Sequence, residues 1–265
     1  MARPKRFWKW IAGGVAVVLL LVVGGPFIYI HFIEDKAPPP ISFADADKAN
    51  SAATSLPGAS ITTTTVAGGS GTATTAPAAN ATPLSGGIAG NWAATNASLF
   101  GYRVKEKLFG QNTEAYGRTN SVTGNMVVNG TTIESGTITV DLTTVKSDQS
   151  QRDGQFQGRI MNTSQFPTAK FVLTKPIGLG SVPADKQEIK VTGTGNLTLR
   201  DVTKQVDIPM TARLNGDHIE VTGSLNIVFA DWGIDNPSAG PAQTADNGTM
   251  EFLVVFTKAA QGDPS

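Results

Sequence analysis

The stretch "VDIPMTARLNGDHIEVTGSLNIVF", Val206 to Phe229, decides the fold because it reads as two strands joined by a tight turn. Alternate residues of a strand face the same side, and the apolar residues follow that spacing. They are Val206, Ile208, Met210, Ala212 and Leu214 before the turn, and Ile219, Val221, Leu225, Ile227 and Phe229 after it. The Asn-Gly pair between them is the strongest short signal for a hairpin turn. The stretch therefore predicts an antiparallel β-hairpin with one buried face.

The same alternation recurs on both sides of this hairpin, from about residue 89 to residue 259. Val-Asn-Gly-Thr at 128–131 supplies a second turn signal, and no long helical period appears in the region. The pattern predicts an all-β domain of eight antiparallel strands, near 98–108, 116–128, 132–145, 169–175, 187–200, 203–215, 218–229 and 248–258. Eight strands are enough to close a barrel whose interior is filled or holds one small ligand.

Several features favour a hollow barrel over a solid sandwich with bulges. The predicted strands of ten or more residues are longer than the usual five or six. Glycine inside a strand weakens pairing and marks a bend, a bulge or a closely approaching ligand, and proline marks an edge, a bulge or a bend. These residues are Gly136, Gly193, Gly195, Gly223 and Pro209. Alternation alone does not separate the two architectures, so both remain open.

One segment, "QSQRDGQFQGRIMNTSQFPTAKF" at 149–171, interrupts the strands with a helical pattern. Ser147 or Asp148 is suited to cap the helix, and its apolar face comprises Phe156, Ile160 and Met161. Phe166-Pro167 ends it, because the residue before a proline avoids helical backbone angles. We expect a crossover helix over one mouth of the barrel. Arg152 and Asp153 either grip a ligand head group or serve the helix itself, through a nearby carboxylate and the helix N-terminus.

The chain before the barrel divides into three parts. Residues 1–10 are basic, and an uncharged apolar run from Ile11 to Ile30 follows. A bilayer-spanning helix needs roughly 20 apolar residues, so we expect a single transmembrane anchor at 11–33 with a cytoplasmic N-terminus and an extracytoplasmic C-terminus. A cleaved signal peptide is the alternative. Residues 34–88 are rich in Ala, Thr, Ser, Pro and Gly, which predicts a disordered linker; residues 260–265 form a short tail.

Composition argues against several classes of function. A formal net charge of zero offers no basic field for nucleic acid, and the absence of cysteine removes thiolate and cysteine-ligated metal chemistry. With only two histidines and no nucleophile or phosphate-binding motif, we expect no catalytic and no metal-ligating residue. An envelope lipid or glycan enzyme using Asp231 and Asp235 is the weaker alternative.

Four motifs in order resemble those of the YceI-like family: "KSDQSQRDGQFQG" leading to "SQFPTAKFVLTKP", then "GTGNLTLRDVTKQVDIPM", "FADWGIDNPS" and "DNGTMEFLVVFTK". The resemblance covers the predicted domain at 89–259. It implies a hollow, lipocalin-like, eight-stranded barrel, exported in bacteria, that binds a polyisoprenoid or similar long apolar chain such as a quinone or polyprenyl phosphate. The matching motif positions include Arg152, Asp153, Pro167, Gly195, Thr203, Asp231 and Gly233. Gln155 stands where the family commonly has histidine, which weakens any shared head-group contact and leaves the barrel intact.

The sequence thus predicts a membrane-tethered lipid-binding protein of the bacterial cell envelope, with no cofactor other than a bound polyisoprenoid and no nucleic-acid partner. A structural or partner-binding domain with a solid β core is the alternative. The residues expected at the barrel lining or mouth are Phe156, Ile160, Phe166, Phe171, Ile138, Val140, Leu142, Leu197, Phe229 and Trp232.

Overall fold

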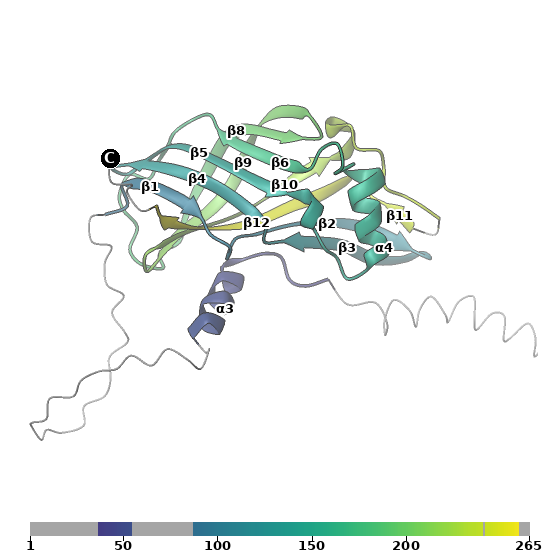
Figure 1. The fold of residues 1–265 in the computed structure, drawn as a ribbon, viewed down its shortest axis with the longest axis horizontal. Helices are drawn as coiled ribbons and strands as arrows, with labels where there is room; N and C mark the ends of the chain where they lie inside the picture. Colours follow the sequence, from purple (N-terminus) through teal and green to yellow (C-terminus); the bar gives the residue numbers. More distant parts are fainter. Residues whose placement is uncertain (1–36, 55–86, 241, 260–265) are drawn as a thin grey trace, which may run out of the picture.

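Eight antiparallel strands close into a ring in the computed structural model, which describes residues 37–54, 87–240 and 242–259 (Figure 1). These residues contain β1 (Gly90–Ala94), β2 (Leu99–Leu108), β3 (Gln111–Thr119), β4 (Val122–Asn129), β5 (Thr132–Asp141), β6 (Thr168–Leu173), β7 (Ile177–Gly178), β8 (Ile189–Leu199), β9 (Val202–Asn215), β10 (His218–Val228), β11 (Ala242–Thr244) and β12 (Asn247–Lys258). The ring runs β1-β4-β5-β6-β8-β9-β10-β12 and closes where β12 pairs with β1. The predicted all-β barrel is confirmed.

The observed strands differ from the prediction, which also lacks the short strands β7 and β11. The structure adds β1, and it divides the strand expected at 116–128 into β3 and β4. The division follows from the side-chain pattern, because Ala115, Gly117 and Thr119 are buried in β3 whereas Val122 and Met126 are buried in β4. The buried positions have odd numbers in β3 and even numbers in β4. One continuous strand cannot bury both sets on the same face, so the strand is interrupted at residues 120–121.

Strand β12 has its two faces covered by different parts of the molecule. Met250, Phe252, Val254 and Phe256 line the barrel interior, as the alternation requires. The opposite face carries Glu251, Leu253 and Val255, which are also buried. A second layer therefore covers β12 on the outside of the barrel.

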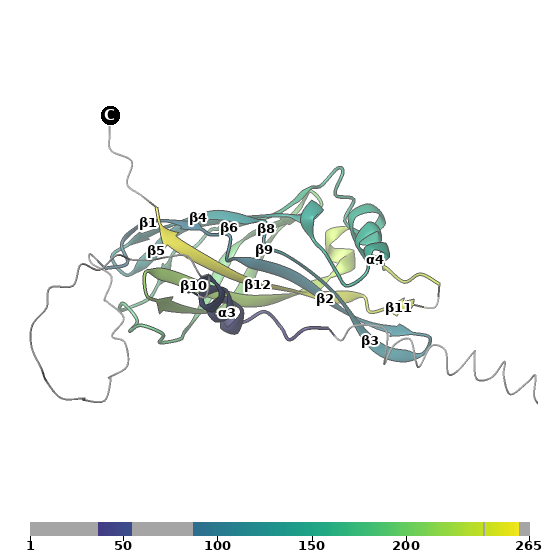
Figure 2. The same cartoon turned by 60° about the horizontal axis from the view of Figure 1, so that its bottom comes forward.

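That outer layer is residues 37–54, which we call the strap; it includes helix α3 (Phe43–Thr54) and runs along the outer wall (Figure 2). Ile41, Phe43 and Ala46 pack against Leu253 and Val255 in a small apolar cluster. The prediction of disorder over 34–88 is wrong for the strap, because its few apolar residues find a partner more than 200 positions away in sequence. Ile88, placed in the same predicted linker, is also buried, in the barrel cluster with Trp92.

Two arginine-centred clusters fasten the strap. Arg103 Nε lies 2.9 Å from Glu251 Oε2 and its Nη1 lies 2.7 Å from Glu114, while its Nη2 donates to the carbonyl of Pro38. The same Glu251 carboxylate accepts from Arg118 at 3.2 Å and from the strap amide of Ile41 at 3.2 Å. Although burial opposes its charge, the hydrogen bonds to Glu251 and Glu114 raise the pKa of Arg103.

The second cluster lies at the other end of the strap. Arg213 Nε is 2.7 Å from the fully buried Glu220, and its Nη2 is 2.6 Å from Asp47 of α3. The guanidinium also lies over the Phe43 ring, 4.4 Å from its centre, an arrangement that adds cation–π attraction. In both clusters, strap atoms bond to charged side chains that are buried in the barrel wall. These contacts explain why this short segment is ordered.

The predicted crossover helix is present and short. It comprises α4 (Ser150–Gln155) continued by a π-helical turn, η4 (Phe156–Ile160), and it lies at one end of the barrel (Figure 1). The expected cap by Ser147 or Asp148 is wrong: Gln149 precedes the helix and makes no capping bond through its side chain. The helix also ends at Met161, five residues before Phe166. The chain turns there because Asn162 adopts a left-handed conformation, with φ of 47°.

Strands β9 and β10 pair only between Met210 and Asn215 of β9, next to Pro209. Proline lacks the amide that a continued ladder would need, so the two strands separate beyond it. The prediction that Pro209 marks an edge or bend agrees with this register. A 3-10 turn, η5 (Phe229–Trp232), follows β10, and a second one, η3 (Leu142–Thr144), follows β5.

The predicted anchor at 11–33, most of the predicted linker and the tail at 260–265 lie outside the described residues. Within the described residues, no helix combines the length and apolar character needed to cross a bilayer.

Candidate functional site

The barrel interior contains a cavity of about 140 Å³ enclosed by inward-facing apolar side chains. All eight strands of the ring except β1 supply lining residues, among them Val122, Ile138, Phe171, Leu197, Ile208, Val221 and Phe252. Gly195 has a clear packing role in this wall, because a Cβ there would lie 2.4 Å from the ring of Phe171. The hollow barrel is therefore the architecture observed, and its wall is apolar.

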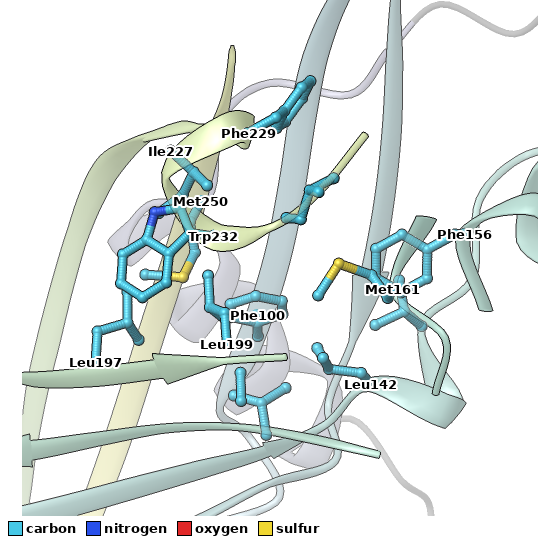
Figure 3. Close-up of a cluster of buried hydrophobic side chains, with 14 of the residues drawn as sticks. Phe100, Leu142, Phe156, Met161, Leu197, Leu199, Ile227, Phe229, Trp232 and Met250 are labelled. Carbon is cyan, nitrogen blue, oxygen red and sulfur yellow. The ribbon is translucent and has the colours of Figure 1, made fainter. Parts of the chain in front are cut away.

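A larger cavity of about 680 Å³ lies at the end of the barrel below α4 and η4. The helix contributes Phe156 and Ile160, and β2 contributes Tyr102, Val104, Glu106 and Leu108. Figure 3 shows Phe156 and Met161 directed toward Phe100 and Leu142 in this region. The helix thus covers the mouth of a cavity, as the sequence predicts.

The two cavities adjoin at Phe100 and Met250, which line both of them. Phe100 comes from β2 and Met250 from β12, and the two residues are two register positions apart across the pair, since Met250 opposes Tyr102 and Phe252 opposes Phe100. Methionine is unbranched and adapts its shape readily. A long apolar molecule that occupies both cavities must pass these two side chains.

Polar groups in the larger cavity gather on one side, around Tyr102. Its ring stacks on Phe156 with centres 4.8 Å apart and planes 5° apart. Arg152 forms ion pairs with Asp148, one helical turn earlier, and with Glu106 across the cavity at 3.6 Å. Burial raises the pKa of the Tyr102 phenol above its ordinary range, an effect that Arg152 partly offsets.

The neighbouring Asp153 does not face the ligand space. Its Oδ1 accepts from the amide and the hydroxyl of Ser147, both at 2.7 Å, and its Oδ2 lies 3.5 Å from the exposed Lys146. Asp153 therefore ties the first turn of α4 to the segment that precedes it. Of the two sequence interpretations of the Arg-Asp pair, the helix-supporting one describes Asp153, while Arg152 lines the cavity with its charge already paired.

The structure places eight of the ten predicted lining residues on the two cavities. The smaller cavity contains Ile138, Val140, Phe171 and Leu197, and the larger one contains Leu142, Phe156, Ile160 and Phe229. Phe166 and Trp232 line neither. Phe166 lies 5.9 Å below the guanidinium of Arg200, and Trp232 is buried beside Leu197 and Ile227 with Lys204 5.7 Å from its ring (Figure 3).

Most predicted motif positions hold loops together. Asp231 pairs with Lys204 at 3.2 Å, Thr203 shares a hydrogen bond of 2.8 Å with Thr198, and the carbonyl of Pro167 accepts from Leu142 at 2.8 Å. Gly233 has φ of 61°, which suits glycine, and its carbonyl accepts from Arg200. Asp231 and Gly233 thus fasten the η5 loop to the β8–β9 hairpin, and Pro167 fastens the chain after α4 to η3.

Sequence reasoning missed Phe100, Tyr102, Glu106 and Met250 as cavity residues. The signal was present in "LFGYRVKEKL" at 99–108, where residues 100, 102, 104, 106 and 108 all line the larger cavity. The alternation was hidden because one of these inward positions, Glu106, carries an acidic side chain where an apolar one is expected. Within the described residues, no group of three or more acidic or histidine side chains is arranged to hold a metal ion.

Three solved structures illustrate what the chain is similar to, and the first of them shares its fold. A polyisoprenoid-binding domain from Saccharophagus degradans, implicated in plant cell wall breakdown, superposes with a TM-score of 0.52 at 16% identity, over 63% of this chain and 98% of that one. BcnA from Burkholderia cenocepacia gives 0.47 at 20% identity over 61% and 98% of the two chains. The YceI protein of Campylobacter jejuni gives 0.41 at 13% identity over 55% and 85%.

No curated protein matches the chain. Residues 92–256, more than half of the chain, match the YceI-like domain, and this range contains the closed barrel, the covering helix and both cavities apart from Ile88. The chain belongs to the YceI-like family.

Proposed function

We propose that this protein binds a polyisoprenoid lipid with an uncharged head group, its tail in the barrel and its head beneath α4. The observation that carries the proposal is the pair of adjoining cavities, apolar in the barrel and partly polar below the helix. Family membership supports it, as does the likeness to the polyisoprenoid-binding domain from Saccharophagus degradans. The role is one of binding, with no chemical step.

Burial of the tail supplies the affinity. Each methylene removed from water contributes about 0.8 kcal/mol, so a five-carbon isoprene unit contributes about 4 kcal/mol before association costs are counted. Those costs amount to roughly 4–15 kcal/mol, which a tail of several units offsets without any charged contact. The wall of the smaller cavity fits this mechanism, since Ile138, Leu197 and Phe252 present only hydrocarbon.

The head-group class follows from the charges around the larger cavity. Arg152, the one cation among the residues lining this cavity, is partly exposed and is already shared by two carboxylates, Asp148 and Glu106. This group of three therefore has a net charge of −1, and it repels a phosphate. The amide side chains of Gln151 and Gln155, which also line the cavity, offer uncharged hydrogen-bond donors instead. A quinone or an alcohol fits these groups better than a polyprenyl phosphate.

A matched ligand series tests this assignment. The purified chain is titrated with isoprenoids of one tail length that end in a quinone, an alcohol or a phosphate, and binding is followed by displacement of a fluorescent lipid. We expect the phosphate to bind about tenfold or more weakly, which corresponds to about 1.4 kcal/mol. The Glu106→Gln variant removes the excess negative charge and should narrow that difference. Phosphate binding as tight as alcohol binding would contradict the assignment, and no uptake of any ligand would contradict the function.

We further propose that the protein works at the extracytoplasmic face of a bacterial membrane, held there by residues 11–33. The support is the uncharged run from Ile11 to Ile30 and the basic residues that precede it. Cell fractionation with protease added to spheroplasts tests the placement: the barrel should sediment with membranes and be digested from outside.

A further inference from the structure

The tip of the β2–β3 hairpin combines an exposed aromatic ring with an unfavourable backbone. Leu108 pairs with Gln111, so Phe109 and Gly110 form a two-residue turn, with φ of 50° and 81°. Positive φ at both positions suits Asn-Gly and is strained for a bulky side chain. Phe109 is nevertheless 53% exposed, and it is the one aromatic residue among the exposed large hydrophobics of the described chain.

This combination has no structural purpose that asparagine would not serve better. An exposed ring contributes little to the core, and the turn itself would be relieved by a residue that tolerates a left-handed conformation. Strained backbone at a ring that is more than half exposed points to a functional constraint.

The charges beside the tip indicate what the ring contacts. Lys105 and Lys107 are exposed and alternate with the inward-facing Val104, Glu106 and Leu108 of the same strand. Glu106 is turned into the cavity, where Arg152 pairs with it. The solvent side of the tip therefore presents an aromatic ring and two cations, and the acid opposite Lys105, Glu114, is paired with Arg103. This combination is suited to the interface of a bilayer that contains anionic lipids.

The tip also forms the rim of the larger cavity, because Leu108 and Phe109 both line it. The N-terminal end of the strap lies at the same end of the barrel. The amide of Ile41 donates to Glu251, and α3 packs further along β12. Figure 2 shows the strap running from α3 toward β3. A lipid that leaves the cavity at this rim would emerge near the N-terminal end of the strap, where Pro38 accepts from Arg103.

The distances are compatible with a common surface. Phe109 lies six residues beyond Arg103, about 20 Å at 3.3 Å per strand residue, and Arg103 holds Pro38 of the strap. Pro38 lies eight positions after Ile30, the end of the apolar run, and an extended chain of eight steps spans at most about 28 Å. If the apolar run lies in a bilayer, the tip can reach the same bilayer.

We propose that the β2–β3 tip docks on an anionic membrane surface, with Phe109 inserted among the lipid head groups and Lys105 and Lys107 on the phosphates. Docking opens the rim of the larger cavity directly onto the membrane, so that an isoprenoid passes between bilayer and barrel without crossing water. This inference goes beyond lipid binding by assigning the surface and the route of exchange. Docking itself is measurable whether or not the cavity holds a lipid.

Site-specific labelling is straightforward because the chain contains no cysteine. Phe109→Cys and the control Asp217→Cys, in the β9–β10 turn at the opposite end, are labelled with an environment-sensitive fluorophore in the full-length chain. The chains are reconstituted in vesicles of phosphatidylethanolamine and phosphatidylglycerol that contain a spin-labelled quencher lipid. We expect blue-shifted, strongly quenched emission at position 109 and little quenching at 217. Equal quenching at both positions, or none at 109, overturns the proposal.

Further variants separate docking from folding and from binding. Phe109→Asn should melt at the same or a higher temperature, because asparagine suits the turn, and should slow isoprenoid transfer between vesicles about tenfold. Val182→Asn changes an exposed residue in the loop beside the β4–β5 turn and should leave transfer unchanged. Lys107→Gln, at an exposed side chain that lines neither cavity, should also slow transfer, while its uptake of lipid from detergent and that of Val182→Asn should be normal. Unchanged transfer in Phe109→Asn contradicts docking, whereas failed uptake from detergent in the unmodified chain contradicts lipid binding instead.

Discussion

Glu251 is the residue on which the attachment of the strap most depends, and its replacement by alanine should destabilise the protein measurably. The side chain is 3% exposed and accepts hydrogen bonds from Arg103, Arg118 and the amide of Ile41. Alanine removes the carboxylate and leaves the buried Arg103 with Glu114, which is about one-third exposed. The variant therefore retains a buried cation that has lost its better partner.

The size of the effect follows from that loss. Breaking a buried ion pair by removing one partner costs about 3–5 kcal/mol, and the remaining Glu114 contact places the change near about 3 kcal/mol. For a domain of this size, 1 kcal/mol changes the melting temperature by about 2–4 °C. We expect Glu251→Ala to melt about 6–12 °C below the unmodified chain.

Scanning calorimetry at neutral pH measures the change, and two further variants define its cause. Asp231→Ala removes the partner of Lys204 in an exposed pair and should lower stability by less than about 1 kcal/mol. The double variant Arg103→Met with Glu251→Met should lose less stability than Glu251→Ala, because the buried Arg103 charge is removed with its partner, while Glu114 and Arg118, which also lose a partner, are partly exposed to solvent. A Glu251→Ala melting temperature within 2 °C of the unmodified chain would refute the reasoning.

Two further predictions concern the cavities. Ala169 is buried in the wall of the smaller cavity, so Ala169→Phe should fill part of it and shift the bound isoprenoids toward shorter tails, as mass spectrometry of eluted lipid would show; an unchanged length distribution would place the tail elsewhere. Burial raises the pKa of Tyr102, so its contribution to stability is complete below the unfolded-state pKa of about 10 and is lost as pH rises above it. When the pH is raised from about 9 to 11, the free energy of urea unfolding should therefore fall less for Tyr102→Phe than for the unmodified chain. An equal fall in both would contradict the burial of the Tyr102 phenol.

The sequence predicted the barrel well where one face of a strand is uniformly apolar. The hairpin at Val206–Phe229 is the clearest case, since its Asn-Gly turn and both strands are observed. Strand β1 escaped prediction because "GNWAA" places a single large residue, Trp92, inside the protein. The strap escaped for a different reason: Ile41 and Phe43 become buried through contact with β12, a partner that local composition does not reveal.

The candidate site was predicted in part for the same reasons. Alternation placed Ile138 and Val140 on a cavity wall, and helical spacing placed Phe156 at its mouth. Motif resemblance alone put Phe166 and Trp232 there, but both residues pack against cations of the β8–β9 hairpin. A residue in a family motif can therefore serve the packing of the fold instead of contacting a ligand.

Analysis of the lipid that accompanies the purified chain tests the central claim most directly. The full-length protein is purified from a bacterial membrane fraction in mild detergent, extracted with organic solvent, and the extract is analysed by mass spectrometry beside an extract of the Ala169→Phe variant. We predict an isoprenoid with an uncharged head group, present in near-equal molar amount to the protein. An extract without isoprenoid, from a protein that also takes up none when it is offered, would contradict the account.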